Sequence, residues 1–139
     1  MLLQTSYYNK ETEASINSKV GKPFGIWQTF KMSGKGSQRF NIIEANQELN
    51  ELLLQQNSVP QTNIELRPDG IILWFRVKID NWVLVLPYYQ LSIITNQNEL
   101  VLHAGEWRIK LLPAHNLPLN LKFISKLLEI KGYNQAPLD

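Results

Sequence analysis

The stretch IDNWVLVLPYYQLSIIT, residues 79–95, is the least polar part of the chain and decides the fold. Its first half holds two alternating apolar sets, which are Trp82, Leu84 and Leu86 on one face and Val83 and Val85 on the other. Successive side chains of a strand point to opposite sides, so this strand is apolar on both faces and must be covered on both. The stretch therefore predicts a strongly curled antiparallel sheet or a closed barrel, with a further covering element.

Pro87 divides this stretch, because proline has no backbone N–H for a central strand to use. We expect a strand over residues 82–86, a corner over 87–90 and a second strand over 91–95. No apolar run approaches the roughly 20 residues of a spanning helix, so no transmembrane segment is expected.

A second strand pattern lies upstream, after the turn signal Pro-Asp-Gly at residues 68–70. One face of this strand is apolar and consists of Ile71, Leu73, Phe75, Val77 and Ile79. The opposite face carries Trp74, Arg76 and Lys78, which is the alternation of a half-buried strand. Asp80-Asn81 is expected to form the hairpin link, and two more strands are expected near residues 99–104 and 106–112.

Two helices are expected beside these strands. Near residues 46–57, Leu49, Leu52 and Leu53 recur at spacings of three and four, which indicates a helix with one buried face. The second helix spans about residues 119–131, and its apolar positions are Leu121, Ile124 and Leu128, broadened by Phe123, Leu127 and Ile130. We expect this C-terminal helix to close the sheet.

The chain is organised as a single α+β domain over residues 24–133, preceded by a flexible or loosely docked leader over residues 1–23. Residues 134–139 are expected to form a tail. Two strands are expected within residues 24–43, joined by the glycine-containing turn SGKGS.

The order of elements in the second half carries a resemblance to a known family. WVLVLPYYQLSIITNQNELVLHAGEWRIKLL, residues 82–112, followed by NLKFISKLLEIKG, residues 120–132, resembles the C-terminal half of bacterial pleckstrin-homology-like and GRAM-like domains. The matching residues are Leu86, Pro87, Tyr88 and Leu91 at the corner, with Leu121, Ile124, Leu127 and Leu128 as the helical plug. The resemblance implies a bent barrel closed by one helix. It also implies binding of peptides, lipid headgroups or copies of the domain, without catalytic residues.

The helix near residues 46–57 departs from that family, because it interrupts a run of strands. If residues 24–43 supply no strands, the alternative is a five-stranded meander with two helices on one face.

Composition excludes several kinds of chemistry. The chain has 139 residues and no cysteine, so disulfides, thiol nucleophiles and thiolate metal sites are absent. Absent cysteine and the lack of a signal-peptide pattern in MLLQTSYYNKE favour a cytoplasmic location. The formal net charge of +2 is too small an excess to indicate nucleic acid.

Catalytic and metal-binding patterns are weak. His103 and His115 are twelve residues apart, which is not a metal-ligand spacing, and no cofactor is expected. Glu44, Glu48 and Glu51 cluster on one helix side, which is typical of a solvated face. A small enzyme with an unrecognised pocket stays open as an alternative, although the sequence favours a protein without catalytic activity.

Residues 18–39 contain five basic residues and no acidic one, interleaved with aromatic residues. Such a strip can contact anionic lipid headgroups or a nucleic-acid backbone. Trp74 is expected on the solvent side of its strand, and one tyrosine of the pair 88–89 is expected to point outward. The candidate contact residues are therefore Lys31, Lys35, Arg39, Trp74 and Tyr89.

These patterns favour non-enzymatic recognition of a protein partner, of a second copy of the chain, or of an anionic surface. A nucleic-acid-binding module that uses residues 18–39 is the alternative.

Overall fold

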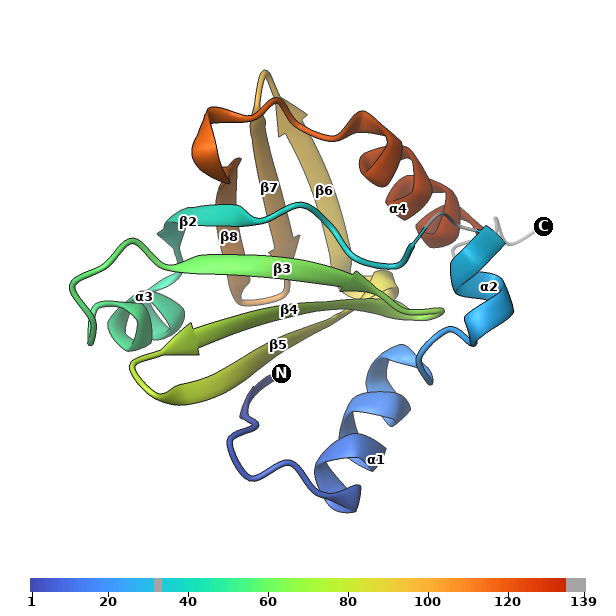
Figure 1. The fold of residues 1–139 in the computed structure, drawn as a ribbon, viewed down its shortest axis with the longest axis horizontal. Helices are drawn as coiled ribbons and strands as arrows, with labels where there is room; N and C mark the ends of the chain where they lie inside the picture. Colours follow the sequence, from blue (N-terminus) through green and yellow to red (C-terminus); the bar gives the residue numbers. More distant parts are fainter. Residues whose placement is uncertain (32–33, 135–139) are drawn as a thin grey trace.

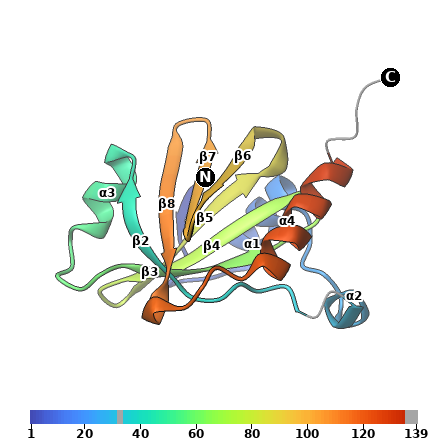
Figure 2. The same ribbon diagram turned by 90° about the horizontal axis from the view of Figure 1, so that it is seen from above.

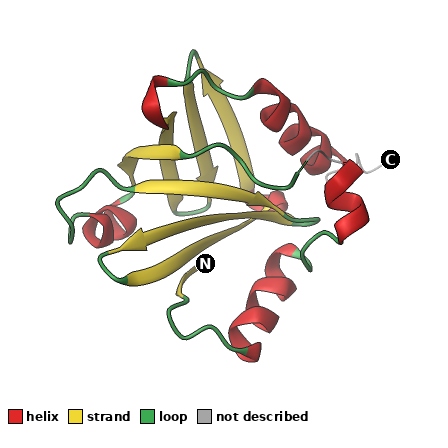
Figure 3. Ribbon diagram, viewed as in Figure 1, coloured by secondary structure: helices red, strands yellow, loops and turns green. Residues whose placement is uncertain are grey.

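The computed structural model describes residues 1–31 and 34–134. Within these residues one antiparallel sheet has the strand order β1-β5-β4-β3-β2-β8-β7-β6 (Figure 1). Its strands are β1 (Leu2–Gln4), β2 (Phe40–Ala45), β3 (Gln61–Leu66), β4 (Gly70–Val77), β5 (Asp80–Pro87), β6 (Leu91–Asn96), β7 (Glu99–Ala104) and β8 (Trp107–Pro113). The helices are α1 (Lys10–Val20), α2 (Ile26–Lys31), α3 (Gln47–Leu53) and α4 (Leu121–Asn134), with the short 3-10 helices η1 (Tyr88–Gln90) and η2 (Ala114–Asn116). Figure 3 shows the helices placed around this sheet.

The corner after β5 forms as the proline predicted. β5 ends at Pro87, η1 turns the chain, and β6 begins at Leu91. Tyr88 is buried, and its hydroxyl donates a 2.9 Å hydrogen bond to the Arg67 carbonyl oxygen. Tyr89 is 72% exposed, so one tyrosine points inward and the other outward.

The sheet does not close into a barrel. β1 and β6 lie at the two ends of the strand order, and each pairs with one neighbour, β5 and β7 respectively. The prediction of a barrel or a strongly curled sheet is therefore not supported. Helices cover both apolar faces of β5, α4 through the main core and α1 on the opposite face, so both faces are buried without closure of the sheet.

That covering helix is α1. Ile16 and Val20 of α1 are buried against Ile72, Val83 and Val85, which form the face of β4 and β5 opposite to the main core. α1 and α4 accordingly lie on opposite sides of β4 and β5 (Figures 1 and 2). A strand that is apolar on both faces is thus covered on both, as the sequence predicted.

Residues 1–23 differ from the expected leader. They form β1, which pairs with β5, and α1, which is docked by two buried side chains. Two apolar positions four residues apart are too short a pattern to indicate a helix against so polar a background. Residues 135–139 of the expected tail lie outside the described part of the chain.

Residues 24–43 also differ from expectation. Residues 26–31 form the short helix α2, and β2 begins at Phe40, so the region supplies one strand rather than two. The helix expected over 46–57 is present as α3 and is shorter.

The β4–β5 turn is shifted from its expected place. It falls on Lys78 and Ile79, with Lys78 at φ 57, while Asp80 and Asn81 are already in β5. Ile79 is therefore exposed and does not belong to the apolar face of β4. Val77 remains the last buried residue of that face.

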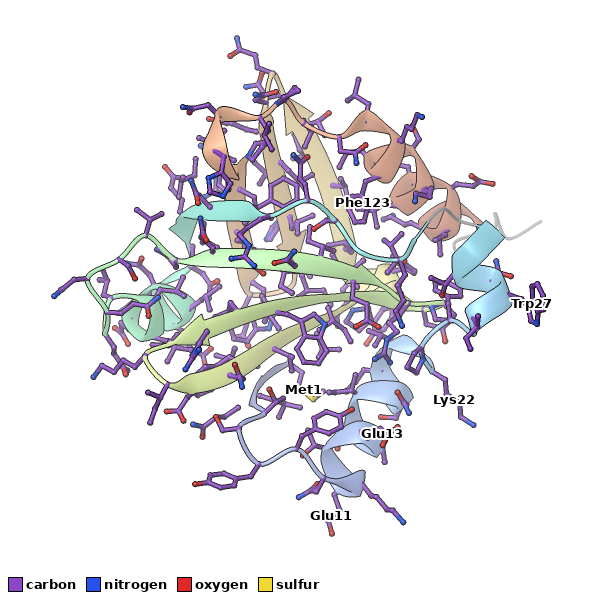
Figure 4. The ribbon with its side chains drawn as sticks, in the orientation of Figure 1. Met1, Glu11, Glu13, Lys22, Trp27 and Phe123 are labelled. Atoms are coloured by element: carbon purple, nitrogen blue, oxygen red, sulfur yellow. The ribbon has the colours of Figure 1, made fainter. Side chains whose placement is uncertain are left out.

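The C-terminal helix α4 covers the main core, as predicted, with a different set of side chains. Phe123, Ile124 and Leu127 are buried, and Figure 4 shows Phe123 directed toward the sheet. Leu121 and Leu128 are exposed, so the inward stripe is rotated from the expected one. Among the described residues, no helix is long and apolar enough to cross a membrane.

Candidate functional site

A hollow of about 670 Å³ lies over the face of β3, β4 and β5 that α1 leaves uncovered. Its lining comes from the segment before α1, from the residue before β2 and from the three strands, and consists of Thr5, Tyr8, Arg39, Gln61, Asn63, Trp74, Phe75, Arg76 and Asn81. A second hollow of about 250 Å³ shares Arg39, Gln61 and Arg76 with the first and adds Gln56, Ser58, Val59 and Lys78. We call the two hollows together the groove.

The groove follows from strand alternation. In β4 the side chains of Leu73, Phe75 and Val77 are buried in the main core, so those of Trp74 and Arg76 point to the opposite face. Trp74 is paired in register with Asn63 of β3. Arg76 is paired with Asn81 of β5. Polar and aromatic side chains of three strands therefore meet on one surface.

The groove is cationic. Arg39, Arg76 and Lys78 are exposed, and no carboxylate among the described residues forms an ion pair with any of them. Arg39 Nη1 donates only a long hydrogen bond, 3.4 Å, to Gln61 Oε1. None of the described lining residues is acidic. Three cations without a counterion favour an anionic ligand.

Trp74 is held in place by a buried polar chain. Its Nε1 donates a 3.0 Å hydrogen bond to Glu65 Oε1, and Glu65 Oε2 lies 2.6 Å from Arg67 Nε. Arg67 is only 4% exposed, and its Nη1 donates to Asn17 Oδ1 at 3.0 Å and to the Gly21 carbonyl oxygen at 2.9 Å. Because Asn17 belongs to α1 and Gly21 caps it, the docked helix fixes the ring orientation. Arg67 also neutralises Glu65, so this carboxylate does not offset the cations of the groove.

The segment before α1 closes one side of the groove. The Thr5 backbone N–H donates to the Asn81 carbonyl oxygen at 2.6 Å, and the Asn81 N–H donates to Ser6 Oγ at 3.0 Å. The Thr5 hydroxyl, in a residue that is 6% exposed, has no hydrogen-bond partner in the described part of the chain. A buried hydroxyl without a partner costs about 1–3 kcal/mol, so Thr5 is a local weak point of this segment.

Tyr8 lies at the same side and is 48% exposed. Partial burial, followed by the nearby Glu13 carboxylate, raises the pKa of Tyr8 above its ordinary value. The Tyr8 ring therefore stays neutral at pH 7 and adds no negative charge to the groove.

The sequence-predicted contact residues come together only in part. Arg39 and Trp74 line the same hollow. Lys35 precedes β2 and is half-buried outside that lining, and Tyr89 lies on η1, where its hydroxyl accepts a 3.3 Å hydrogen bond from Gln90 Nε2. The Lys31 side chain lies outside the described part of the chain.

Most side chains of the groove are not among the sequence-predicted contact residues, and Arg76, Lys78, Thr5 and Tyr8 are the main ones. Arg76 shares its strand face with Trp74, so the alternation that singled out Trp74 could also have found it. Thr5 and Tyr8 gave no such signal, because the pairing of β1 with β5 brings them to the site from about 75 residues away in sequence. The strip over residues 18–39 is not one surface, since Lys19 lies on α1 and Trp27 projects from α2 away from the body (Figure 4).

Other chemistry finds less support in the described residues. They contain no group of three His, Asp or Glu side chains that could hold a metal ion. Glu44 is exposed and pairs with Arg108 at 3.6 Å and with Lys110 at 3.5 Å, which is a surface arrangement. Comparison of the chain with models of protein families, with curated proteins and with solved structures found no match.

Proposed function

We propose that this chain is a non-enzymatic recognition domain that binds an anionic partner in the groove. The observation that carries the proposal is the set of three cations, Arg39, Arg76 and Lys78, in a concave surface whose described lining holds no carboxylate. Carboxylate and phosphate groups are the ligands that such a surface favours, because guanidinium groups donate paired hydrogen bonds to both.

The lining favours binding over catalysis. The described residues around the larger hollow supply hydroxyl, amide, guanidinium and aromatic groups, and none of them is His, Asp, Glu or Lys. General acid–base catalysis at neutral pH uses mainly groups of those types, and the raised pKa of Tyr8 makes this lining residue a poor base at pH 7. The resemblance to pleckstrin-homology-like domains, which concerns the order of elements and not the open sheet, implies binding of peptides, lipid headgroups or copies of the domain, and the groove adds that the bound group is anionic. A reducing, cytoplasmic setting belongs to the same proposal, because the chain has no cysteine.

The expected contribution of the two arginines can be worked out. A hydrogen bond to a charged group contributes about 1.5–3 kcal/mol. Loss of Arg39 and Arg76 together should therefore cost at least about 3 kcal/mol of binding free energy, which is roughly a hundredfold in Kd. Both side chains are exposed, so their replacement should leave the fold intact.

The test is isothermal titration calorimetry at low salt with two probes, inorganic tripolyphosphate and a hexaglutamate peptide. The Arg39→Ala, Arg76→Ala double variant should lose about a hundredfold in affinity for whichever probe binds. The matched control is Lys19→Ala, Lys122→Ala, which removes the same charge from exposed positions outside the groove. Absence of binding by both probes, or an equal loss in the control, would contradict the proposal.

A further inference from the structure

The groove has two chemically different ends. Aromatic rings, Tyr8 and Trp74, line only the larger hollow. Lys78 lines only the smaller one, while Arg39 and Arg76 line both. The surface therefore passes from aromatic and polar groups, through two guanidinium groups, to a third cation.

We propose that the ligand of the groove is a nucleotide, with its base at the Tyr8–Trp74 end and its phosphates at Arg39, Arg76 and Lys78. This inference rests on the proposed function, because it assigns the anionic groups to phosphates and adds a planar ring. A di- or triphosphate matches the number of cations that the two hollows supply.

The aromatic end suits a base. The Trp74 N–H is already bound to Glu65, so the part of the indole left for a ligand is its ring surface. Trp74 is half-buried and Tyr8 is 48% exposed, so both rings are held and still present surface to the groove. Aromatic rings and guanidinium planes bind nucleobases by stacking, without a requirement for a particular sequence.

Polar groups around this end match the edge of a base. The amides of Asn63 and Asn81 each carry donors and an acceptor, which is the mixture that base edges display.

The size of the groove favours a mononucleotide over a polymer. The larger hollow, about 670 Å³, falls within the roughly 300–1,000 Å³ of small-molecule sites. An acidic peptide would use the cations and leave the two rings without a planar partner. A long single strand needs cations that continue along its backbone beyond one nucleotide.

The experiment compares ATP, adenosine, tripolyphosphate, hexaglutamate and a twelve-residue oligothymidylate, titrated calorimetrically into the full chain. ATP should bind at least about tenfold more tightly than tripolyphosphate, because only ATP uses the rings. Tyr8→Leu should reduce the affinity for ATP about tenfold and leave that for tripolyphosphate unchanged. Tyr8 is a surface residue, so this variant is expected to fold, and Trp74→Leu is the second variant. The matched control is Trp27→Leu, which removes an 81% exposed ring outside the groove.

The outcomes separate this inference from the proposed function. If tripolyphosphate binds through Arg39 and Arg76 as tightly as ATP, the nucleotide assignment is overturned and anion recognition stands. Tighter binding of hexaglutamate or of the oligonucleotide than of ATP also overturns it, in favour of an acidic peptide or a strand. If none of the anionic probes binds, both proposals fail.

Discussion

Arg67 binds the C-terminal end of α1 to the sheet, and its replacement by methionine is the sharpest test of how this contact is held. The side chain is almost fully buried, and its guanidinium group contacts Glu65 at 2.6 Å, Asn17 at 3.0 Å and the Gly21 carbonyl oxygen at 2.9 Å. Methionine keeps an unbranched chain of similar volume, so Arg67→Met removes the charge and the hydrogen bonds with little loss of packing.

The magnitude follows from what is left unpaired. Removal of one partner from a buried ion pair costs about 3–5 kcal/mol, because the remaining charge stays in a poorly solvated place. The Glu65 side chain is 16% exposed and keeps its hydrogen bond from Trp74. The cost at this site should therefore lie at the lower end of the range of about 3–5 kcal/mol. We expect Arg67→Met to lower the free energy of unfolding by about 3 kcal/mol, a large part of the roughly 5–15 kcal/mol typical of a domain.

Urea unfolding followed by tryptophan fluorescence measures this change, and the dependence on denaturant should keep its slope. Glu44→Gln is the control, since it breaks exposed ion pairs and should cost less than about 1 kcal/mol. Adding Glu65→Gln to Arg67→Met should recover about half of the loss, because it removes the unpaired charge. A loss below about 1 kcal/mol in Arg67→Met, or no recovery in the double variant, would refute the reasoning.

Three further predictions concern the fold. A Cβ at Gly70 would lie 2.5 Å from the Leu86 carbonyl oxygen, so Gly70→Ala should lower the free energy of unfolding, measured in urea, by about 3 kcal/mol. The control Gly25→Ala places a Cβ with no atom within 4 Å and should change this free energy by less than about 1 kcal/mol. Phe123→Ala should lower the free energy of unfolding by about 3–5 kcal/mol, because this side chain is buried, and Leu121→Ala, at an exposed position, should lower it by less than about 1 kcal/mol. Equal losses in the two variants would contradict the position of α4. Burial, and to a smaller extent the Asp69 charge, raises the pKa of Tyr88. Above pH 10 the Tyr88 hydroxyl therefore loses its proton in the unfolded chain before it does so in the folded chain. The free energy of unfolding should then fall by up to about 1.4 kcal/mol per pH unit. Tyr88→Phe should flatten that part of a urea-midpoint profile between pH 9 and 11.

Local patterns in the sequence were sufficient for the second half of the sheet. The alternation in β4 and the double apolar face of β5 follow from the two-residue period of a strand, and the corner follows from the missing N–H of Pro87. Each of these signals is contained within a few residues. These predictions therefore do not require knowledge of which elements pack against the strands.

Long-range pairing was not predictable from such patterns. The register Leu2↔Leu84 joins residues 82 positions apart, and it decides that β1 is an edge of the sheet and that α1 covers β5. The barrel was expected because a strand that is apolar on both faces must be buried on both. The apolar pattern of β5 does not say whether a helix or another part of the sheet covers each face. The site shows the same limit, because Arg39 and Trp74 were found separately and only the pairing through β3 brings them together.

The buried ion pair between Arg67 and Glu65 connects the docking of α1 with the chemistry of the groove. Trp74 presents its ring to the groove while its N–H donates to Glu65 at 3.0 Å, which fixes the orientation of the indole. A carboxylate beside the groove would weaken its attraction for anions, and Arg67 cancels that charge from the side of α1. α1 therefore covers the second apolar face of β5 and, by binding Arg67 through Asn17 and Gly21, helps to hold the carboxylate that contacts Trp74 in a neutral pair. The helix that covers this side of the sheet thus also keeps the Glu65 charge from offsetting the cations Arg39, Arg76 and Lys78.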